Sequence, residues 1–252
     1  WADGEVDVDF LAQIPCSVLA DPAPSLTIQF GHGLLGSRDE STQDYLGAFL
    51  DDHHAVMIAS NWRGMSKHDR GDITLMMAQD LGMFPRVPER TLQGFVELDA
   101  VVRHIQEGGF DEEPAMMVDD VAVFDPKQTA FYGISQGGIL GVGYLGFSSR
   151  LDRGAVSVPG GPFTTIMPRS VHFEAFRLIL EARYPDARDV AVMLAAIQTL
   201  WEPAEGSGWA GGMTDEVLIQ TALGDSQVSA LAAHNIARAL GAKSVAPEVR
   251  EI

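Results

Sequence analysis

The 252-residue sequence contains a single cysteine, Cys16, which excludes an internal disulfide framework and a cysteine-built metal site. Lysine and arginine are also scarce, since 17 of them stand against 35 acidic residues and give a formal net charge of −18. Without a basic cluster, the chain is a poor partner for nucleic acid or an anionic membrane surface. No segment approaches the roughly 18 consecutive apolar residues of a membrane span, and no basic-then-apolar signal peptide opens the sequence.

What the sequence does have is the composition of a soluble globular enzyme, with 46% hydrophobic and 21% charged residues. It shows neither a phosphate-binding loop nor a dinucleotide fingerprint, and adjacent residues in the run Asp51–His54 cannot all face one ion. We therefore expect no cofactor and no metal. The compartment stays open between the cytoplasm and secretion after processing, and the oligomeric state stays open as well.

Short β-branched or apolar segments alternate with longer helical ones, which predicts an α/β fold with a mostly parallel sheet flanked by helices. The periodicities place strands at residues 25–30, 54–60, 129–132, 153–158 and 216–222, and helices at 90–105, 138–145 and 228–240.

Residues 162–212 carry apolar side chains at helical spacing with no strand pattern among them. Such a long excursion between two sheet strands predicts helices placed over the carboxyl edge of the sheet, as a cap or lid. Ordinary helices packed on a sheet face are the alternative. The predicted organisation is thus a core at 1–161, a cap insertion at 162–212 and the continuation of the core at 213–252.

A G-x-S-x-G motif, Gly133–Gly137, lies between the strand expected at 129–132 and a helix. A strand that turns abruptly into a helix forces Ser135 into a strained backbone, and Gly133 and Gly137 leave room for that turn. Ser135 would present its hydroxyl at the helix N-terminus, where unpaired N–H groups favour an oxyanion and hence acyl transfer. The alternative is a glycine-rich turn with an incidental serine.

Acyl transfer needs two backbone donors for the developing oxyanion, one of them normally on the residue after the nucleophile, here Gln136. The loop Gly31–Gly36 follows an earlier strand and can supply the second donor from Leu34, because its neighbouring glycines, including Gly33, let the backbone approach the acyl oxygen. His32 is interpreted as a structural residue that hydrogen-bonds this loop, with a direct catalytic role as the minority alternative.

Three segments together resemble a serine esterase or lipase of the α/β-hydrolase superfamily: Gly31–Gly36 (GHGLLG), Gly133–Gly138 (GISQGG) and Gly224–Val228 (GDSQV). The resemblance implies an α/β-hydrolase fold in which nucleophile, acid and histidine follow one another along the chain. It also implies an acid after a late strand and, frequently, a helical lid between the two strands before that acid.

Asp225 fits the acid because it comes after Ser135, at the end of a strongly β-forming run, and Gly224 permits the turn. Its alternative role is to cap the helix that follows, shared with Ser226. The other acids after Ser135 fall in loops or at helix ends: Asp152, Asp186, Asp189 and Asp215.

The base is harder to assign, because only His172 and His234 follow Ser135. His234 sits inside a helical pattern only nine positions past Asp225, and His172 falls in the predicted cap. A different explanation uses the ends of the sequence, which opens on Trp1 and closes at Ile252 without a final strand, histidine loop or helix. We favour the interpretation that the sequence is a fragment and that the base lies downstream of residue 252.

The predicted function is hydrolysis of carboxylic esters, with a small and lipophilic ester as substrate, through an acyl-enzyme formed on Ser135. A thioesterase, amidase or peptidase using the same residues is an alternative, since leaving-group preference depends on the pocket. A noncatalytic protein that keeps the scaffold for binding is the alternative from another class.

Overall fold

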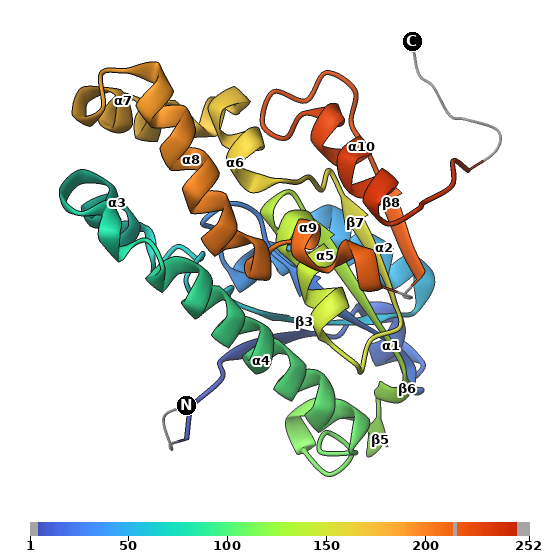
Figure 1. Cartoon of the computed structure of the whole chain (residues 1–252). Coiled ribbons are helices and arrows are strands. Elements are labelled where there is room, and N and C mark those ends of the chain that lie inside the picture. The colour runs from blue at the N-terminus through green and yellow to red at the C-terminus, as the bar shows by residue number, and fades with distance from the viewer. Residues whose placement is uncertain (1–4, 214–215, 246–252) are drawn as a thin grey trace.

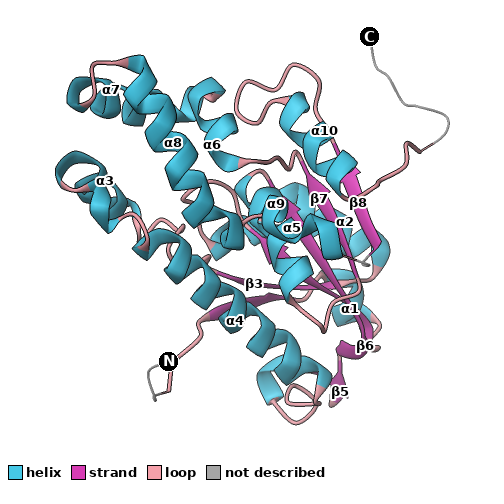
Figure 2. Cartoon of the chain, viewed as in Figure 1, coloured by secondary structure: helices cyan, strands magenta, loops and turns pink. Residues whose placement is uncertain are grey.

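The computed structural model describes residues 5–213 and 216–245 and has a six-stranded sheet at its centre (Figures 1 and 2). Its strand order is β1-β3-β2-β6-β7-β8, in which β1 runs antiparallel to β3 and all other neighbours are parallel. The strands are β1 (Phe10–Gln13), β2 (Ser25–Gly31), β3 (Val56–Ser60), β6 (Phe124–Ile134), β7 (Arg153–Ser157) and β8 (Glu216–Gln220). A separate hairpin pairs β4 (Met117–Val118) with β5 (Val121–Ala122).

Helices flank this sheet. They are α1 (Cys16–Ala20), α2 (Asp44–His53), α3 (Arg70–Gln79), α4 (Arg86–Gln106), α5 (Gln136–Phe147), α6 (Phe163–Ile166), α7 (Glu174–Arg183), α8 (Ala187–Trp201), α9 (Gly206–Trp209) and α10 (Ala230–Ala239). The predicted fold class, a mostly parallel sheet flanked by helices, is confirmed.

Successive side chains of β3 alternate between the two faces of the sheet and pack against the helices on each face. Val56 and Ile58 pack on one face of the sheet with residues of α4, whereas Met57 and Ala59 pack on the other with Leu46 and Leu50 of α2. Successive side chains of a strand point to opposite faces, so a strand buried on both sides reads as a continuous apolar run. Residues 55–59 are such a run, and all are buried.

The element boundaries differ from the prediction in a few places. The strand expected at 129–132 lies within the eleven-residue β6. The helix expected from residue 228 begins at Ala230, because Asp225 holds the preceding residues in a turn. The sequence did not predict β1, a short edge strand whose four residues are only half-buried. Val8, Phe10, Ala12 and Ile14 pack on one buried cluster at every second position, a strand period that the sequence prediction overlooked.

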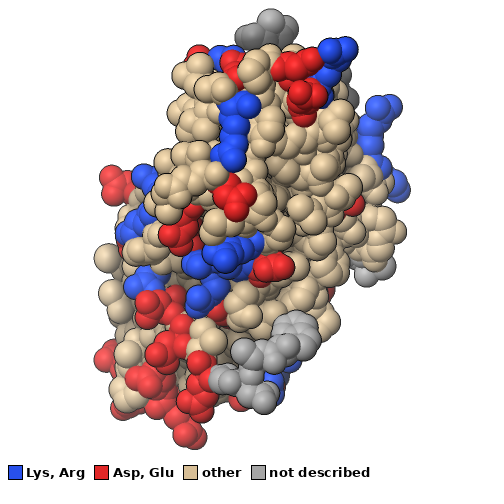
Figure 3. All heavy atoms as spheres, turned by 60° about the vertical axis from the view of Figure 1, so that its left-hand side comes forward, with Lys and Arg blue, Asp and Glu red and all other residues tan. Residues whose placement is uncertain are grey.

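Exposed carboxylates gather toward the lower end of the molecule in Figure 3, where α4 ends and the β4–β5 hairpin lies. The exposed acids between residues 107 and 120 are Glu107, Asp111, Glu112, Glu113, Asp119 and Asp120. Across residues 5–213 and 216–245, no helix combines the length and the apolar character that crossing a bilayer requires.

Candidate active site

The predicted site residues follow neighbouring strand ends on one edge of the sheet. Gly31 at the end of β2 is the register partner of Gly133 in β6, and Ile134 of β6 pairs with Ser157 of β7. Ser157 in turn pairs with Gln220, the last residue of β8. Loops that leave parallel strands at their carboxyl ends meet at one edge, which is where open α/β sheets bind ligands.

Ser135 occupies the sharp turn between β6 and α5 and has φ 57° and ψ −120°, a conformation that L-residues rarely adopt. Its N–H donates to the Ser157 carbonyl at 3.0 Å, and its own carbonyl accepts from Gly138 and Ile139. A Cβ on Gly137 would overlap the carbonyl oxygen of Gly31, so the turn and the end of β2 pack backbone against backbone. The serine is therefore held in place by its neighbours' main chain.

Three amide groups of the loop after β2 are engaged in hydrogen bonds. Gly33 N–H donates to Glu40 Oε2 at 2.8 Å, Leu35 N–H to Gln136 Oε1 at 3.2 Å, and Gly36 N–H to the Gly33 carbonyl at 3.1 Å. The Leu34 N–H has no hydrogen-bond partner within the described chain, and neither does the N–H of Gln136 in the first turn of α5. These are the two donors that the sequence assigned to the oxyanion.

His32 is fully buried beneath this loop and hydrogen-bonds main-chain groups on both sides. Its Nε2 accepts from the Trp62 N–H at 3.0 Å, which leaves the proton on Nδ1, and Nδ1 donates to the Gly33 carbonyl at 2.9 Å. Burial lowers the pKa of His32, which favours the neutral ring that this arrangement uses. The contacts are those of a residue that holds the loop.

Asp225 lies in the loop after β8, five residues past Gln220. Its Oδ1 accepts from the N–H groups of Gln227 at 2.7 Å and Val228 at 3.0 Å. The same loop contacts the insertion, since Ser226 O accepts from the Val171 N–H at 3.1 Å. The carboxylate thus has one oxygen fixed by main-chain donors, a geometry compatible both with a turn cap and with an acid that orients a histidine.

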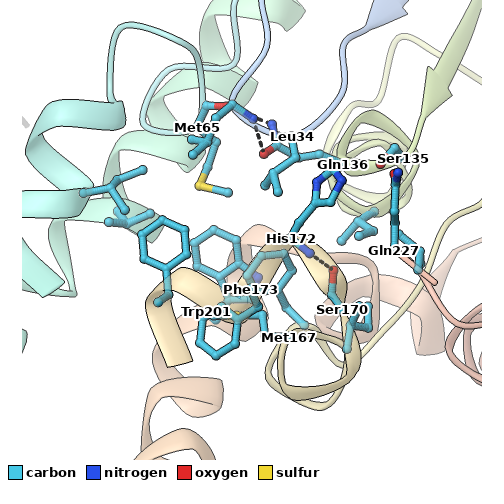
Figure 4. Close-up of a pocket in the computed structure, with 18 of the residues that line it drawn as sticks. Leu34, Met65, Ser135, Gln136, Met167, Ser170, His172, Phe173, Trp201 and Gln227 are labelled. Atoms are coloured by element: carbon cyan, nitrogen blue, oxygen red, sulfur yellow. Dashed lines mark hydrogen bonds between the residues drawn. The ribbon is translucent and has the colours of Figure 1, made fainter. Parts of the chain in front are cut away.

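A cavity of about 110 Å³ opens beside Ser135 (Figure 4). One side comes from the core, the other from residues 163–201, and almost all of its lining is apolar. The lining residues are Leu34, Leu35, Met65, Ile73, Met76, Met77, Phe84, Val87, Ser135, Gln136, Ile139, Phe163, Ile166, Met167, Ser170, His172, Phe173, Phe176, Trp201, Gln227 and Val228.

Similar solved structures share this architecture at low sequence identity. The chain matches a Mycobacterium tuberculosis puromycin-hydrolyzing peptidase at 16% identity and TM-score 0.57, over 87% of this chain and 29% of the peptidase. It matches the acetyl xylan esterase from Paenibacillus sp. R4 at 15% identity and TM-score 0.57, over 87% and 66% of the two chains. A Pyrococcus horikoshii acylaminoacyl peptidase is 13% identical with TM-score 0.60, over 95% and 33%.

This chain has the α/β-hydrolase fold. The family resemblance drawn from the sequence motifs is thereby confirmed at the level of the fold. The chain spans about 66% of the length of the esterase and about 29% of that of the puromycin-hydrolyzing peptidase. No protein-family profile matches the sequence, and no curated protein is detectably similar to it.

The two histidines that follow Ser135 lie in different surroundings within the α/β-hydrolase fold. His172 lines the cavity, and Figure 4 shows its ring projecting from the insertion toward the side where Ser135 and Gln136 lie. His234 is exposed on α10 and does not line the cavity. Ser135, Leu34 and Gln136 therefore line one cavity, and His234 is outside its lining.

Sequence reasoning missed two side chains that shape the donor loop. Glu40 accepts from Gly33 N–H, and the Gln136 side chain spans from Leu35 N–H to the Met65 carbonyl, to which its Nε2 donates at 2.8 Å. The sequence pattern points only to the backbone N–H of Gln136. A buried amide beside a nucleophile could have signalled this role, because such a side chain needs partners for both its oxygen and its nitrogen.

A buried carboxylate, which the sequence also did not reveal, ties together parts of residues 162–212. Glu205 is fully buried and accepts from Phe163 N–H at 2.7 Å, Gln198 Nε2 at 2.5 Å and the Ser207 hydroxyl. Gln198 Oε1 accepts in turn from the N–H of Thr164 at 3.1 Å and from its hydroxyl at 2.7 Å. Burial raises the pKa of Glu205. The network joins α6 to α8, both of which line the cavity.

Proposed function

We propose that the chain carries the nucleophile, oxyanion donors and acid of a serine hydrolase that cleaves carboxylic esters. The observation that carries this proposal is the meeting of Ser135 with two unengaged amides, those of Leu34 and Gln136, at an apolar cavity. Donors fixed in advance where negative charge develops are the largest single contribution to many enzymes' rates. The names of the similar structures, two peptidases and an esterase, are consistent with it.

In the proposed reaction, the Ser135 hydroxyl oxygen attacks the acyl carbon while a histidine oriented by Asp225 takes its proton. The carbonyl oxygen becomes an oxyanion that accepts from Leu34 N–H and Gln136 N–H. The histidine then protonates the leaving alkoxide as its bond to carbon breaks, which leaves an acyl ester on Ser135. Water attacks this ester by the same steps and releases the carboxylic acid. Residues 162–212 are proposed to act as the cap over this site.

A second candidate is cleavage of amides or peptides, favoured by the two peptidases among the similar structures. The same nucleophile and oxyanion donors serve either reaction, and preference between them depends on the surrounding contacts. Hydrolysis of a matched nitrophenyl ester and nitroanilide of the same acyl group compares the two directly.

The test is labelling by a fluorophosphonate, with the modified residue located by mass spectrometry in the protein at its natural length. We expect the label on Ser135, and we expect Ser135→Ala to lose both labelling and turnover of short nitrophenyl esters by about 1,000-fold or more. Ser170→Ala is the matched control, because Ser170 lines the same cavity. Equal rates of nitrophenyl ester hydrolysis in wild type and Ser135→Ala would instead support a noncatalytic binding protein.

A further inference from the structure

Within the part of the chain that the structure describes, no charged side chain lines the cavity beside Ser135, and this limits what can occupy it. Among the residues that line it there is no Asp, Glu, Lys or Arg, and the polar ones are Ser135, Gln136, Ser170, His172 and Gln227. Burying a charge without a partner costs several kcal/mol even after relaxation. A carboxylate or ammonium group on the part of the substrate that enters the cavity would have no counter-ion there.

Trp201, the last residue of α8, forms an aromatic wall of this cavity. It is 1% exposed, and its ring lies 4.9 Å from that of Phe163 in α6 and 6.1 Å from that of Phe84, measured between centroids. Figure 4 shows Trp201 with Phe173 on the side of the cavity away from Ser135. A group attached to Ser135 and extending into the cavity therefore runs toward Trp201.

The volume limits how much of that group can be buried. An apolar cavity of about 150 Å³ accepts a benzene ring, and the present cavity measures about 110 Å³. It has room for an aliphatic group of about four to six carbon atoms by this comparison. A fatty acyl chain of about twelve carbons is not buried completely without movement of the walls, because packed side chains yield little.

Resting on the proposed function, we propose that this cavity binds the uncharged apolar acyl group of the substrate, about four to six carbons long, and that Trp201 sets its length. The proposal separates short-chain and medium-chain esters from long-chain lipids. It assigns the length limit to a residue of the insertion, not to the catalytic residues.

The experiment measures kcat/KM for nitrophenyl esters of acetate, butanoate, hexanoate and dodecanoate, with a hemisuccinate as the charged counterpart of butanoate. We expect about a fourfold gain per methylene up to hexanoate, from the burial of each CH₂, and no gain at dodecanoate. The hemisuccinate should be at least about 100-fold slower than butanoate.

Trp201→Ala should raise the dodecanoate-to-hexanoate ratio about tenfold or more, since the wall is removed. Trp201→Phe, the smaller change, should move the ratio in the same direction by a few-fold and keeps the proposal testable if the alanine variant does not fold. Val192→Ala is the matched control, because Val192 lies on the same helix with 70% of its surface exposed. Circular dichroism checks that each variant is folded.

The outcomes are distinguishable. Absence of Ser135 labelling and of all ester cleavage overturns the proposed function. Labelled, active protein whose rates keep rising through dodecanoate, or which cleaves the hemisuccinate as fast as butanoate, overturns the inference alone. Folded Trp201→Ala and Trp201→Phe variants with the wild-type chain-length profile overturn the assignment to Trp201.

Discussion

The two sides of the cavity are held by different kinds of contact. On the core side, the turn at Ser135 and the end of β2 meet backbone to backbone, and main-chain hydrogen bonds position the serine. On the insertion side, the walls are held by side chains, the Glu205 network and the rings around Trp201. Main-chain packing tolerates almost no substitution, whereas side-chain packing can be remodelled. We therefore expect substitutions on the core side to abolish the reaction, and substitutions on the side of residues 163–201 to alter the preference for the acyl group.

We expect the largest loss of activity from a substitution on the core side, at Asp225. Asp225→Asn keeps an oxygen that can accept from Gln227 and Val228 but removes the negative charge. If Asp225 orients the base, ester turnover should fall by about 1,000- to 10,000-fold while the melting temperature stays nearly unchanged. Steady-state kinetics and thermal denaturation of the same preparation test this. Full activity in the asparagine variant would reduce Asp225 to a turn cap.

Gly137→Ala tests the backbone contact directly. The new Cβ would overlap the Gly31 carbonyl, so the end of β2 and the turn must separate. We expect the free energy of unfolding to fall by about 3 kcal/mol, at the upper end for overpacking, with activity lost together with stability. Chemical denaturation gives the value, and Gly211→Ala is the control, because a Cβ there meets no atom within 4 Å. Equal stability of the two variants would contradict the close approach.

Glu40 should matter less, because it acts through the loop and touches no reacting atom. Glu40→Ala removes the acceptor of Gly33 N–H and should lower kcat about 10- to 100-fold by displacing the Leu34 donor, below the 100- to 1,000-fold cost of losing such a donor. KM should change little. Glu40→Gln retains a carbonyl oxygen for Gly33 and should restore most of kcat. A rise in KM with kcat unchanged would show instead that the loop contributes to substrate binding.

On the insertion side, Glu205 links stability to pH. A carboxyl whose folded pKa is raised contributes stability that is present below its unfolded pKa and is lost as pH rises through the folded pKa. Wild-type stability should therefore decline from about pH 4.5 upward across this window, and Glu205→Gln should remove that part of the decline. Urea unfolding at pH 5 and pH 8 measures the difference, with the exposed Glu202→Gln as control.

The smallest effect is expected at His234. It is exposed on α10 and lies outside the cavity lining, so His234→Gln should change the free energy of unfolding by no more than about 0.5 kcal/mol. Turnover should remain within about twofold of wild type, since Asp225 would orient a different histidine. A loss of 1,000-fold or more would restore His234 as the base.

The sequence was informative where the backbone is strained and silent where side chains meet across the chain. The glycines around Ser135 and in the loop Gly31–Gly36 reveal turns that few residues allow, and the structure places both at adjacent strand ends. Glu40 and Glu205 could not be found in this way, because their partners are set by packing. Nothing in the local pattern distinguishes a buried carboxylate from a solvated one.

The cavity joins two stretches of chain that are far apart in sequence, residues 65–87 and 163–201. The two stretches also meet through the Arg183 side chain, which donates to the Ala78 carbonyl at 3.3 Å. A molecule that fills the cavity touches both stretches at once and acts as a bridge between them. A bound ligand should thus slow proteolytic cleavage in α3 and α7 and raise the melting temperature. Tight binding can therefore be detected even for a ligand that the protein does not cleave.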